Sequence, residues 1–263
     1  MIDFEMLDKN IEKFSRSYSS ARPFEYVVID RFLTVEGLEA IGSNELMRSK
    51  ATQNLSSDLV FAQAKFESPV IETINPGLRA LRSDLLCDRF RKFLCSIVGR
   101  RVFVDASFTG GGLHQGGSGS YLDMHTDFNR HPTNLNWVRE LNLLLYLNAG
   151  WRPEYGGCLD LENMDTGERQ SIEPLENRMV IMLTKGHTLH GYKKIKFPDG
   201  IMRTSVAAYA YSIDDGCSRD PYTSTKWYPK SFSRRLISLV TNKLVPIKQR
   251  LFGSRTADRA RRE

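Results

Sequence analysis

The spacing of apolar residues changes along the chain, and this change predicts helices first and strands later. Apolar positions three or four residues apart predict helices over 4–14, 35–47 and 75–99. A short run at 25–30 predicts a strand, and 15–23 is predicted to be a loop. We expect these N-terminal helices to pack on the outside of a sheet formed by the rest of the chain.

From residue 102 onwards the apolar runs are short and are separated by Gly, Pro and Asn. They predict strands over 102–108, 121–127, 139–148, 179–183 and 203–211. Many short strands bounded by turn residues are typical of a sandwich or barrel. Between the first two runs, residues 109–120 contain six glycines, and two interpretations stay open: a mobile flap over the site, in which Gln115 lines the pocket, or a plain linker.

The tripeptide His125-Thr126-Asp127 stands on one of these predicted strands. Residues i and i+2 of a strand face the same side, so an imidazole and a carboxylate can grip one ion. Two histidines and one carboxylate that leave coordination positions open are the arrangement of non-haem iron(II) oxygenases. His187 and His190 are candidates for the third ligand, and because they would face opposite sides of a strand only one of them can bind. His131 is disfavoured, because residues 129–132 are predicted to be a turn that leads away from the site.

Five motifs in a fixed order lie between Phe108 and Ser212: H-x-D, LLLYLN, GGxL, HG and R-x-S. This order resembles the 2-oxoglutarate- and Fe(II)-dependent oxygenase superfamily, in its branch with prolyl-4-hydroxylase-like catalytic domains. The resemblance implies an α+β protein built on a double-stranded β-helix, a jelly-roll or cupin-like barrel. We expect a helical and strand support region over 1–100, the oxygenase domain over 101–212 and a basic helical tail over 213–263.

The resemblance also implies the cofactor and the reaction. His125, Asp127 and His190 match the iron ligands, and the co-substrates are 2-oxoglutarate and O2, with ascorbate as a reductant. 2-Oxoglutarate is decarboxylated, releasing CO2 and succinate, while a C–H bond of a small molecule, a sugar- or lipid-linked metabolite or an amino-acid residue is hydroxylated. Halogenating relatives lack the carboxylate, so Asp127 favours hydroxylation.

By the same resemblance, Arg203 pairs with the distal carboxylate of 2-oxoglutarate, because its planar guanidinium fits a carboxylate at two points. Ser205 is the hydroxyl of R-x-S, and Tyr146 hydrogen-bonds the same carboxylate. Asn142 would reach the other end of the acid. The alternative for Arg203 is a buried structural ion pair, since a buried charge must be matched.

Other functions remain compatible with these residues. Within the family the main alternative is a peptidyl-prolyl hydroxylase. A non-catalytic sensor would bind metal and 2-oxoglutarate without turnover. A zinc hydrolase would use the same ligand types but needs a glutamate base near them, as in H-E-x-x-H, and neither His125 nor His190 has one adjacent.

Charge is concentrated at the C-terminus. Residues 226–263 contain eleven Lys or Arg against two acids, whereas the whole chain has a net charge of +6, so residues 1–225 are net negative. Apolar residues at helical spacing accompany the basic ones, and Pro246 is expected to kink or split this helix. Its apolar side could cap the barrel, which we prefer, lie on a membrane surface, or accompany nucleic-acid binding, which we disfavour.

The remaining composition predicts a cytoplasmic protein, in peripheral contact with the inner face of a membrane if the tail binds lipid. No N-terminal signal pattern and no long apolar stretch occurs. The four cysteines, Cys87, Cys95, Cys158 and Cys217, lack paired spacing and are expected to be reduced thiols. Residues 253–263 are expected to be disordered.

Overall fold

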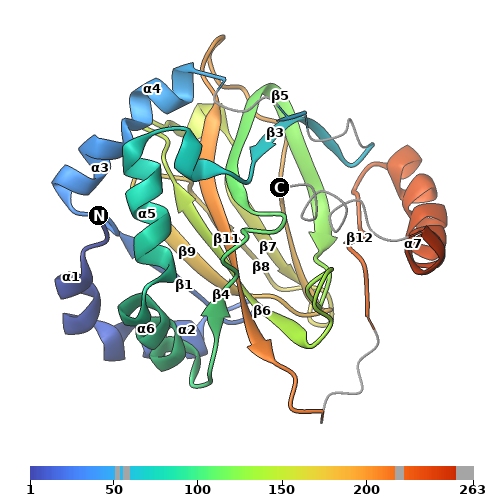
Figure 1. Ribbon diagram of the computed structural model, residues 1–263. Coiled ribbons are helices and arrows are strands. Elements are labelled where there is room, and N and C mark those ends of the chain that lie inside the picture. Colours follow the sequence, from blue (N-terminus) through green and yellow to red (C-terminus); the bar gives the residue numbers. More distant parts are fainter. Residues whose placement is uncertain (51–53, 56–59, 217–221, 253–263) are drawn as a thin grey trace.

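Helices cover one side of a curled sheet in the computed structural model of the chain (Figure 1), which describes residues 1–50, 54–55, 60–216 and 222–252. The first hundred residues form most of the helices: α1 Phe4–Lys9, α2 Ile11–Ser20, α3 Val35–Ile41, α4 Ser43–Arg48, the 3-10 turn η1 Ile71–Thr73, α5 Pro76–Leu86 and α6 Asp88–Val98. Three strands lie among them: β1 Tyr26–Asp30, β2 Asn54–Leu55 and β3 Ala62–Ser68.

The rest of the chain is mainly strand. Its elements are β4 Phe103–Val104, β5 Gly112–Thr126, β6 Trp137–Tyr146, the 3-10 turn η2 Pro153–Tyr155, β7 Leu159–Asn163, β8 Arg169–Ile172, β9 Arg178–Leu183, β10 Thr188–Tyr192, β11 Arg203–Ile213, β12 Lys226–Trp227 and the helix α7 Phe232–Phe252. No helix in the described part of the chain has the length and apolar character needed to cross a bilayer.

All strand pairings among the described residues are antiparallel, and the sheet curls because the long strand β5 changes partners along its length. The main strand order is β1-β9-β6-β11-β5-β10-β7-β8. The first part of β5 pairs with β11 on one side and β3 on the other. Its last residues pair with β10 and β12 instead. Strand β5 is thus shared by the two sides of the curled sheet, which is the arrangement expected of the double-stranded β-helix. The predicted barrel fold is therefore confirmed.

Strand β6 shows how the sheet separates core from site. Its residues Leu141, Leu143 and Leu145 are buried in one apolar cluster with helix residues such as Leu78 and Phe90. The alternate residues of β6 point to the inside of the curl. The prediction that the N-terminal helices pack on the outside of the barrel is therefore confirmed. The boundary between the support region and the oxygenase domain, expected at residue 100, stays a prediction.

Two predicted long helices are each divided. The helix expected over 35–47 ends at Gly42, and α4 begins with the next residue. The helix expected over 75–99 starts as predicted, with the side chain of Asn75 accepting a hydrogen bond from the Leu78 amide. It is interrupted at Cys87, which is extended and whose sulfur accepts from the Phe90 amide at the start of α6.

Two predicted loops are wrong. The loop expected over 15–23 is largely helical, because Tyr18 lies one turn after Phe14 and extends the buried side of α2 to Ser20. The glycine-rich segment 109–120, expected to be a flap or linker, is mostly part of β5. Its glycines serve close packing: a Cβ at Gly112 would collide with the carbonyl oxygen of Ser68 on β3.

Other details also differ from expectation. The strand expected over 102–108 is short, because the carboxylate of Asp105 accepts from the amides of Ser107 and Thr109 and turns the chain. Pro246 does not split the C-terminal helix, since α7 runs unbroken through it, and the alternative of a kink stays a prediction. Cys87, Cys95 and Cys158 are free thiols as predicted, whereas Cys217 and the tail 253–263 lie outside the described residues.

Candidate active site

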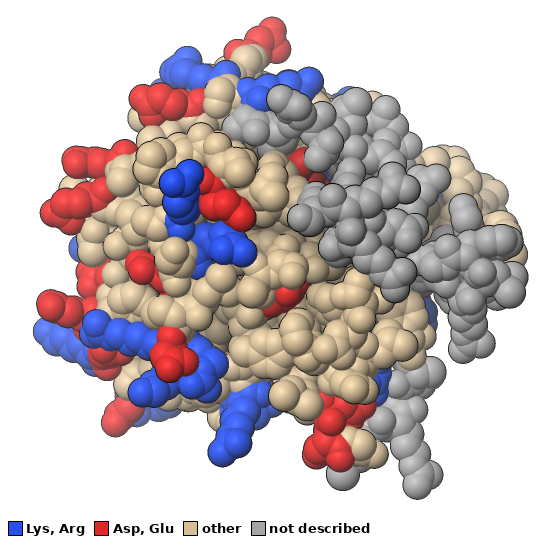
Figure 2. All heavy atoms as spheres, viewed as in Figure 1, with Lys and Arg blue, Asp and Glu red and all other residues tan. Residues whose placement is uncertain are grey.

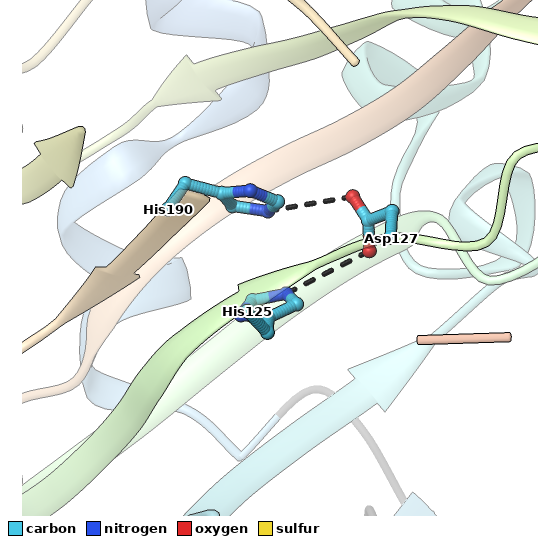
Figure 3. A group of neighbouring side chains, drawn as sticks. All are labelled: His125, Asp127 and His190. Carbon is cyan, nitrogen blue, oxygen red and sulfur yellow. Dashed lines mark ion pairs between the residues drawn. The ribbon is translucent and has the colours of Figure 1, made fainter. Parts of the chain in front are cut away.

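The two preferred histidines face each other across one pair of strands. In the ladder between β5 and β10, His125 is the direct partner of His190, and their ring centroids are 4.2 Å apart. Asp127 follows one residue after the end of β5 and turns its carboxylate toward both rings (Figure 3). His125 Nε2 lies 3.6 Å from Asp127 Oδ1, and His190 Nε2 lies 3.4 Å from Asp127 Oδ2.

These three side chains form a group whose donor atoms all lie within 4.8 Å of one another. Ligands bound side by side to one first-row metal, each at about 2.1 Å, would be about 3 Å apart. Small rotations of the side chains would bring the observed spacing to that value. The donor set and its spacing therefore fit a single divalent ion.

The glycine after His190 allows this approach. A Cβ at Gly191 would lie 2.6 Å from the backbone oxygen of Leu122 on β5, closer than a carbon and an oxygen can come. Any side chain here would push β10 away from β5. The HG motif therefore has a steric reason, which is that the strand carrying His190 must lie close to the strand carrying His125.

The protonation of the group suits metal binding. Burial lowers the pKa of both imidazoles, to about 3 for His190, and the Asp127 charge offsets this only in part. Both rings are therefore neutral near pH 7. His125 Nδ1 donates to the backbone oxygen of Asp123 at 3.0 Å, which leaves the Nε2 lone pair turned toward the group.

The Asp127 carboxyl is ionised for a different reason. Burial alone would raise its pKa, but the Arg139 guanidinium and the two imidazoles outweigh burial and hold the pKa far below its usual range. Arg139 Nη2 lies 3.1 Å from Asp127 Oδ2. Two neutral nitrogens and one negative oxygen are thus presented together.

Asn142 and Arg139 hold this carboxylate in place. Asn142 Nδ2 donates to Asp127 Oδ2 at 2.8 Å and lies 3.4 Å from His190 Nε2. The Oδ1 atom of Asn142 accepts two hydrogen bonds from the fully buried Arg139. The Arg139 guanidinium lies 3.5 Å from the centre of the Tyr209 ring. Asn142 thus contacts the predicted iron ligands. Its predicted contact with 2-oxoglutarate stays a prediction, and the sequence motifs do not indicate a role for Arg139.

Arg203 lies on β11 and points into the protein. Its Nε donates to the Gly157 carbonyl at 2.8 Å, and its Nη2 donates to the Tyr146 hydroxyl at 3.4 Å. Its guanidinium also stacks over the Tyr192 ring at 4.4 Å. In the described part of the chain no carboxylate lies within ion-pair distance of Arg203, so the alternative of a structural ion pair is not what the structure shows. A buried cation without an acidic partner is suited to bind an anion from outside.

A row of side chains crosses the sheet beside Arg203. Ser205 lies opposite Tyr146 on β6 and opposite His114 on β5, and His114 in turn lies opposite Glu67 on β3. Lys65, one pleat from Glu67, forms an ion pair with it at 2.6 Å. Burial lowers the pKa of His114 to about 4. No motif in the sequence marks Lys65, Glu67 or His114, because their proximity depends on the pairing of β3 with β5.

The other histidines and Gln115 lie elsewhere. His187 is outside the metal group, in the turn before β10. His131 is buried and also lies outside the metal group, with Nε2 3.1 Å from the Thr109 hydroxyl. The Gln115 side chain donates through Nε2 to the backbone oxygens of Leu46 and Ser49, and its place in the lining of a pocket stays a prediction.

Aromatic rings cover His125 on its outer side. The Trp227 ring of β12 lies 4.8 Å from the His125 ring and stacks on Phe61 at 5.2 Å. This contact comes from residues far apart in the sequence, and no motif predicts it. It joins the start of the C-terminal region to the strand that carries the first ligand.

Sequence comparison assigns the region that carries these residues. Residues 111–211 match the family model described as the 2OG-Fe(II) oxygenase superfamily, and this range contains His125, Asp127, His190 and Arg203. A search of curated proteins finds no match.

Several solved structures share the fold. A prolyl hydroxylase from Trichoplax adhaerens, in complex with a peptide fragment of the hypoxia inducible factor oxygen degradation domain, is 18% identical, with 81% of this chain and 94% of that chain covered and a TM-score of 0.56. A prolyl-4-hydroxylase from Pseudomonas putida is 17% identical, with 80% and 100% covered and a TM-score of 0.52. HygX from Streptomyces hygroscopicus, with nickel, 2-oxoglutarate and hygromycin B bound, is 13% identical, with 78% and 86% covered and a TM-score of 0.50.

At these identities the structures establish the fold, and the family match establishes the kind of chemistry. The superfamily works with Fe(II), 2-oxoglutarate and O2, and the His–Asp–His group fits that iron. Residues 111–211, which carry the candidate site, therefore match the 2OG-Fe(II) oxygenase superfamily, and the chain shares the fold of solved prolyl hydroxylases.

Proposed function

We propose that this chain is an Fe(II)- and 2-oxoglutarate-dependent hydroxylase in which His125, Asp127 and His190 hold the iron. Arg203, with Tyr146 beside it, binds the distal carboxylate of 2-oxoglutarate. The observation that carries the proposal is the combination of three converging donors with a buried guanidinium that has no acidic partner among the described residues.

Each side chain has a part that follows from its contacts. The neutral imidazoles of His125 and His190 offer lone pairs, and Asp127 supplies one negative charge that reduces the charge of a bound dication. Asn142 and Arg139 fix the rotamer of Asp127 through one of its oxygens. Arg203 offers Nη donors to a carboxylate, because its Nε is already used by Gly157. When bound, the iron and 2-oxoglutarate supply the oxidising chemistry that hydroxylates a C–H bond.

Metal and 2-oxoglutarate binding tests the site directly. Protein purified without oxygen is titrated with Fe(II) and then 2-oxoglutarate, and the absorbance that the two produce together is recorded. Succinate release is measured after oxygen is admitted with candidate substrates. We expect wild type and His187→Ala to develop the absorbance and His125→Ala to lose it.

The control separates the site from general metal binding, because His187 lies outside the group of converging donors. The proposal is wrong if wild type binds neither Fe(II) nor 2-oxoglutarate, or if His125→Ala binds both as well as wild type does. Binding of both without a single turnover of oxygen would identify the sensor alternative instead.

A peptidyl-prolyl hydroxylase is the second candidate, favoured by the peptide bound to the Trichoplax adhaerens enzyme on the same fold. The hygromycin B bound to HygX shows that this fold also holds a small sugar-containing molecule. Assays with a proline-containing peptide and with an aminoglycoside separate these classes. Hydroxyproline in the peptide supports the second candidate. Succinate release with the aminoglycoside but not with the peptide excludes it.

A further inference from the structure

Helix α7 contacts the rest of the protein through its polar side. Arg234 donates two hydrogen bonds to the Asp123 carboxylate on β5, at 2.7 and 3.1 Å. One turn later Ser238 is 4% exposed, and one further turn later Asn242 exchanges two hydrogen bonds with the backbone of Trp227 on β12, each at 2.9 Å. Three positions four residues apart form one side of a helix. That polar side is the one attached to the barrel.

The apolar side of α7 points the other way. Leu236, Val240 and Leu244 follow the attached positions by two residues, which is about 200° around a helix with 3.6 residues per turn. They are 53%, 56% and 57% exposed, and Phe232 and Leu239 beside them are exposed as well. We expected this apolar side to cap the barrel, and that expectation is wrong. Figure 1 shows α7 standing at the far side of the sheet from α1–α6.

The charges on α7 decide what can cover this side. Residues 232–252 contain five Lys or Arg and no Asp or Glu. Arg235 and Lys243 are exposed on the same helix as the apolar positions, and Lys230 is exposed just before it. Other parts of the surface differ: in Figure 2 blue and red side chains are interspersed over the region of α1–α6 on the left.

A second copy of the chain fits this side poorly. A symmetric contact through α7 would bring two segments of like charge together, and like charges face to face are unfavourable. An anionic lipid surface matches both properties. Apolar side chains enter the boundary between headgroups and acyl chains, while basic side chains meet the negative headgroups.

We propose that helix α7 lies on anionic lipid membranes, with Phe232, Leu236, Leu239, Val240 and Leu244 inserted at the interface. The bonds of Arg234 and Asn242 then connect the membrane to the active-site strand. Asp123 is two residues before His125, and Trp227, which Asn242 holds, packs on the His125 ring. The proposed iron site would be held at a fixed position relative to the bilayer.

Vesicle binding tests this without any turnover, so its outcome is independent of the proposed hydroxylase activity. The full chain is mixed with vesicles of phosphatidylcholine alone or with a quarter phosphatidylglycerol, and the bound fraction is measured by sedimentation. We expect binding to the anionic vesicles only. We expect the double variant Leu236→Ser/Val240→Ser to bind at least about tenfold more weakly, since each buried aliphatic side chain contributes more than that factor.

A matched control uses an exposed apolar residue elsewhere. Val35 is 69% exposed on α3, so Val35→Ser removes the same kind of surface far from α7 and should leave vesicle binding unchanged. Thermal melting of all variants checks folding, which these exposed positions should not affect.

Three results would overturn the proposal. One is that the same fraction of the chain sediments with and without anionic vesicles. Another is that wild type and the double variant bind these vesicles equally well. The third is that wild type does not bind vesicles but forms a concentration-dependent dimer in light scattering, and that the double variant does not form this dimer. That result would assign the apolar side to a second copy.

Discussion

Replacing Arg203 by Met should separate its proposed role as an anchor from a structural role. Without 2-oxoglutarate, the substitution mainly removes the hydrogen bond from the charged guanidinium to the Gly157 carbonyl, worth about 1.5–3 kcal/mol. Breaking a buried ion pair would cost about 3–5 kcal/mol. The free energy of unfolding of the apoprotein should therefore fall by less than the loss of a buried ion pair would cause.

With 2-oxoglutarate the difference should be large. A hydrogen bond to a charged group contributes about 1.5–3 kcal/mol, so losing the guanidinium should raise the Kd for 2-oxoglutarate by about 10- to 150-fold. At a concentration of 100 times the wild-type Kd, the ligand stabilises wild type by about 2.7 kcal/mol. A variant with a hundredfold higher Kd keeps about 0.4 kcal/mol at that concentration.

The assay is thermal melting with Mn(II), with and without 2-oxoglutarate. For a protein of this size about 2–4 °C corresponds to each kcal/mol, so wild type should gain about 5–11 °C and Arg203→Met about 1–2 °C. Arg130→Met is the control: Arg130 Nη1 lies 2.6 Å from Asp214 in a partly buried pair, so this variant should lose apoprotein stability but keep the 2-oxoglutarate shift. The reasoning fails if Arg203→Met destabilises the apoprotein as Arg130→Met does and keeps the full ligand shift.

The metal group and its buried neighbours can be probed in three further ways. Gly191→Ala should separate β10 from β5 and weaken metal binding at least about tenfold, as measured by isothermal titration with Mn(II); unchanged affinity would show that the close approach is not needed. Asn142→Leu should weaken metal affinity about 10- to 100-fold, because the Asp127 carboxylate loses the hydrogen bond that holds it in place. If only the affinity for 2-oxoglutarate changes, the result would instead support the predicted contact of Asn142 with the acid. The apoprotein should lose stability as pH falls from about 6.5, the pKa of an unfolded histidine. The folded-state pKa values of His190 and His114 are about 3 and about 4, so between about pH 6.5 and these values protons bind the unfolded state in preference to the folded state. Each of the two histidines then lowers the free energy of unfolding by up to about 1.4 kcal/mol per pH unit. Urea midpoints between pH 7 and 4.5 measure this, and a smaller loss in His114→Phe is expected; a midpoint independent of pH would contradict it.

Local pattern was enough to predict much of this site. The period of two around His125, the apolar run of β6 and the R-x-S at Arg203 all lie within single strands, where alternation alone determines which side chains share a face. The order of motifs then identified the family, and with it the fold. Strand alternation showed that only one of His187 and His190 can bind, and the choice of His190 followed from the family's HG motif.

The errors came from contacts between distant segments. Glycine at 112 and its neighbours indicated a loop, but the structure uses them because β3 and β11 both pack closely against β5. The positions of Arg139 and Lys65 depend on which strands pair, which no window of the sequence contains. For α7, periodicity shows that an apolar side exists but does not determine whether that side faces the barrel or the solvent.

The ladder that sets His125 opposite His190 has a consequence for altering this protein. The positions of the two Cα atoms that carry the imidazoles are set by the paired backbones of β5 and β10 and not by the conformation of any connecting loop. Grafting new turns onto the rim of the barrel to accept another substrate should leave the iron chemistry untouched. A slip of the ladder by a single residue would instead turn one imidazole to the opposite face and eliminate the centre.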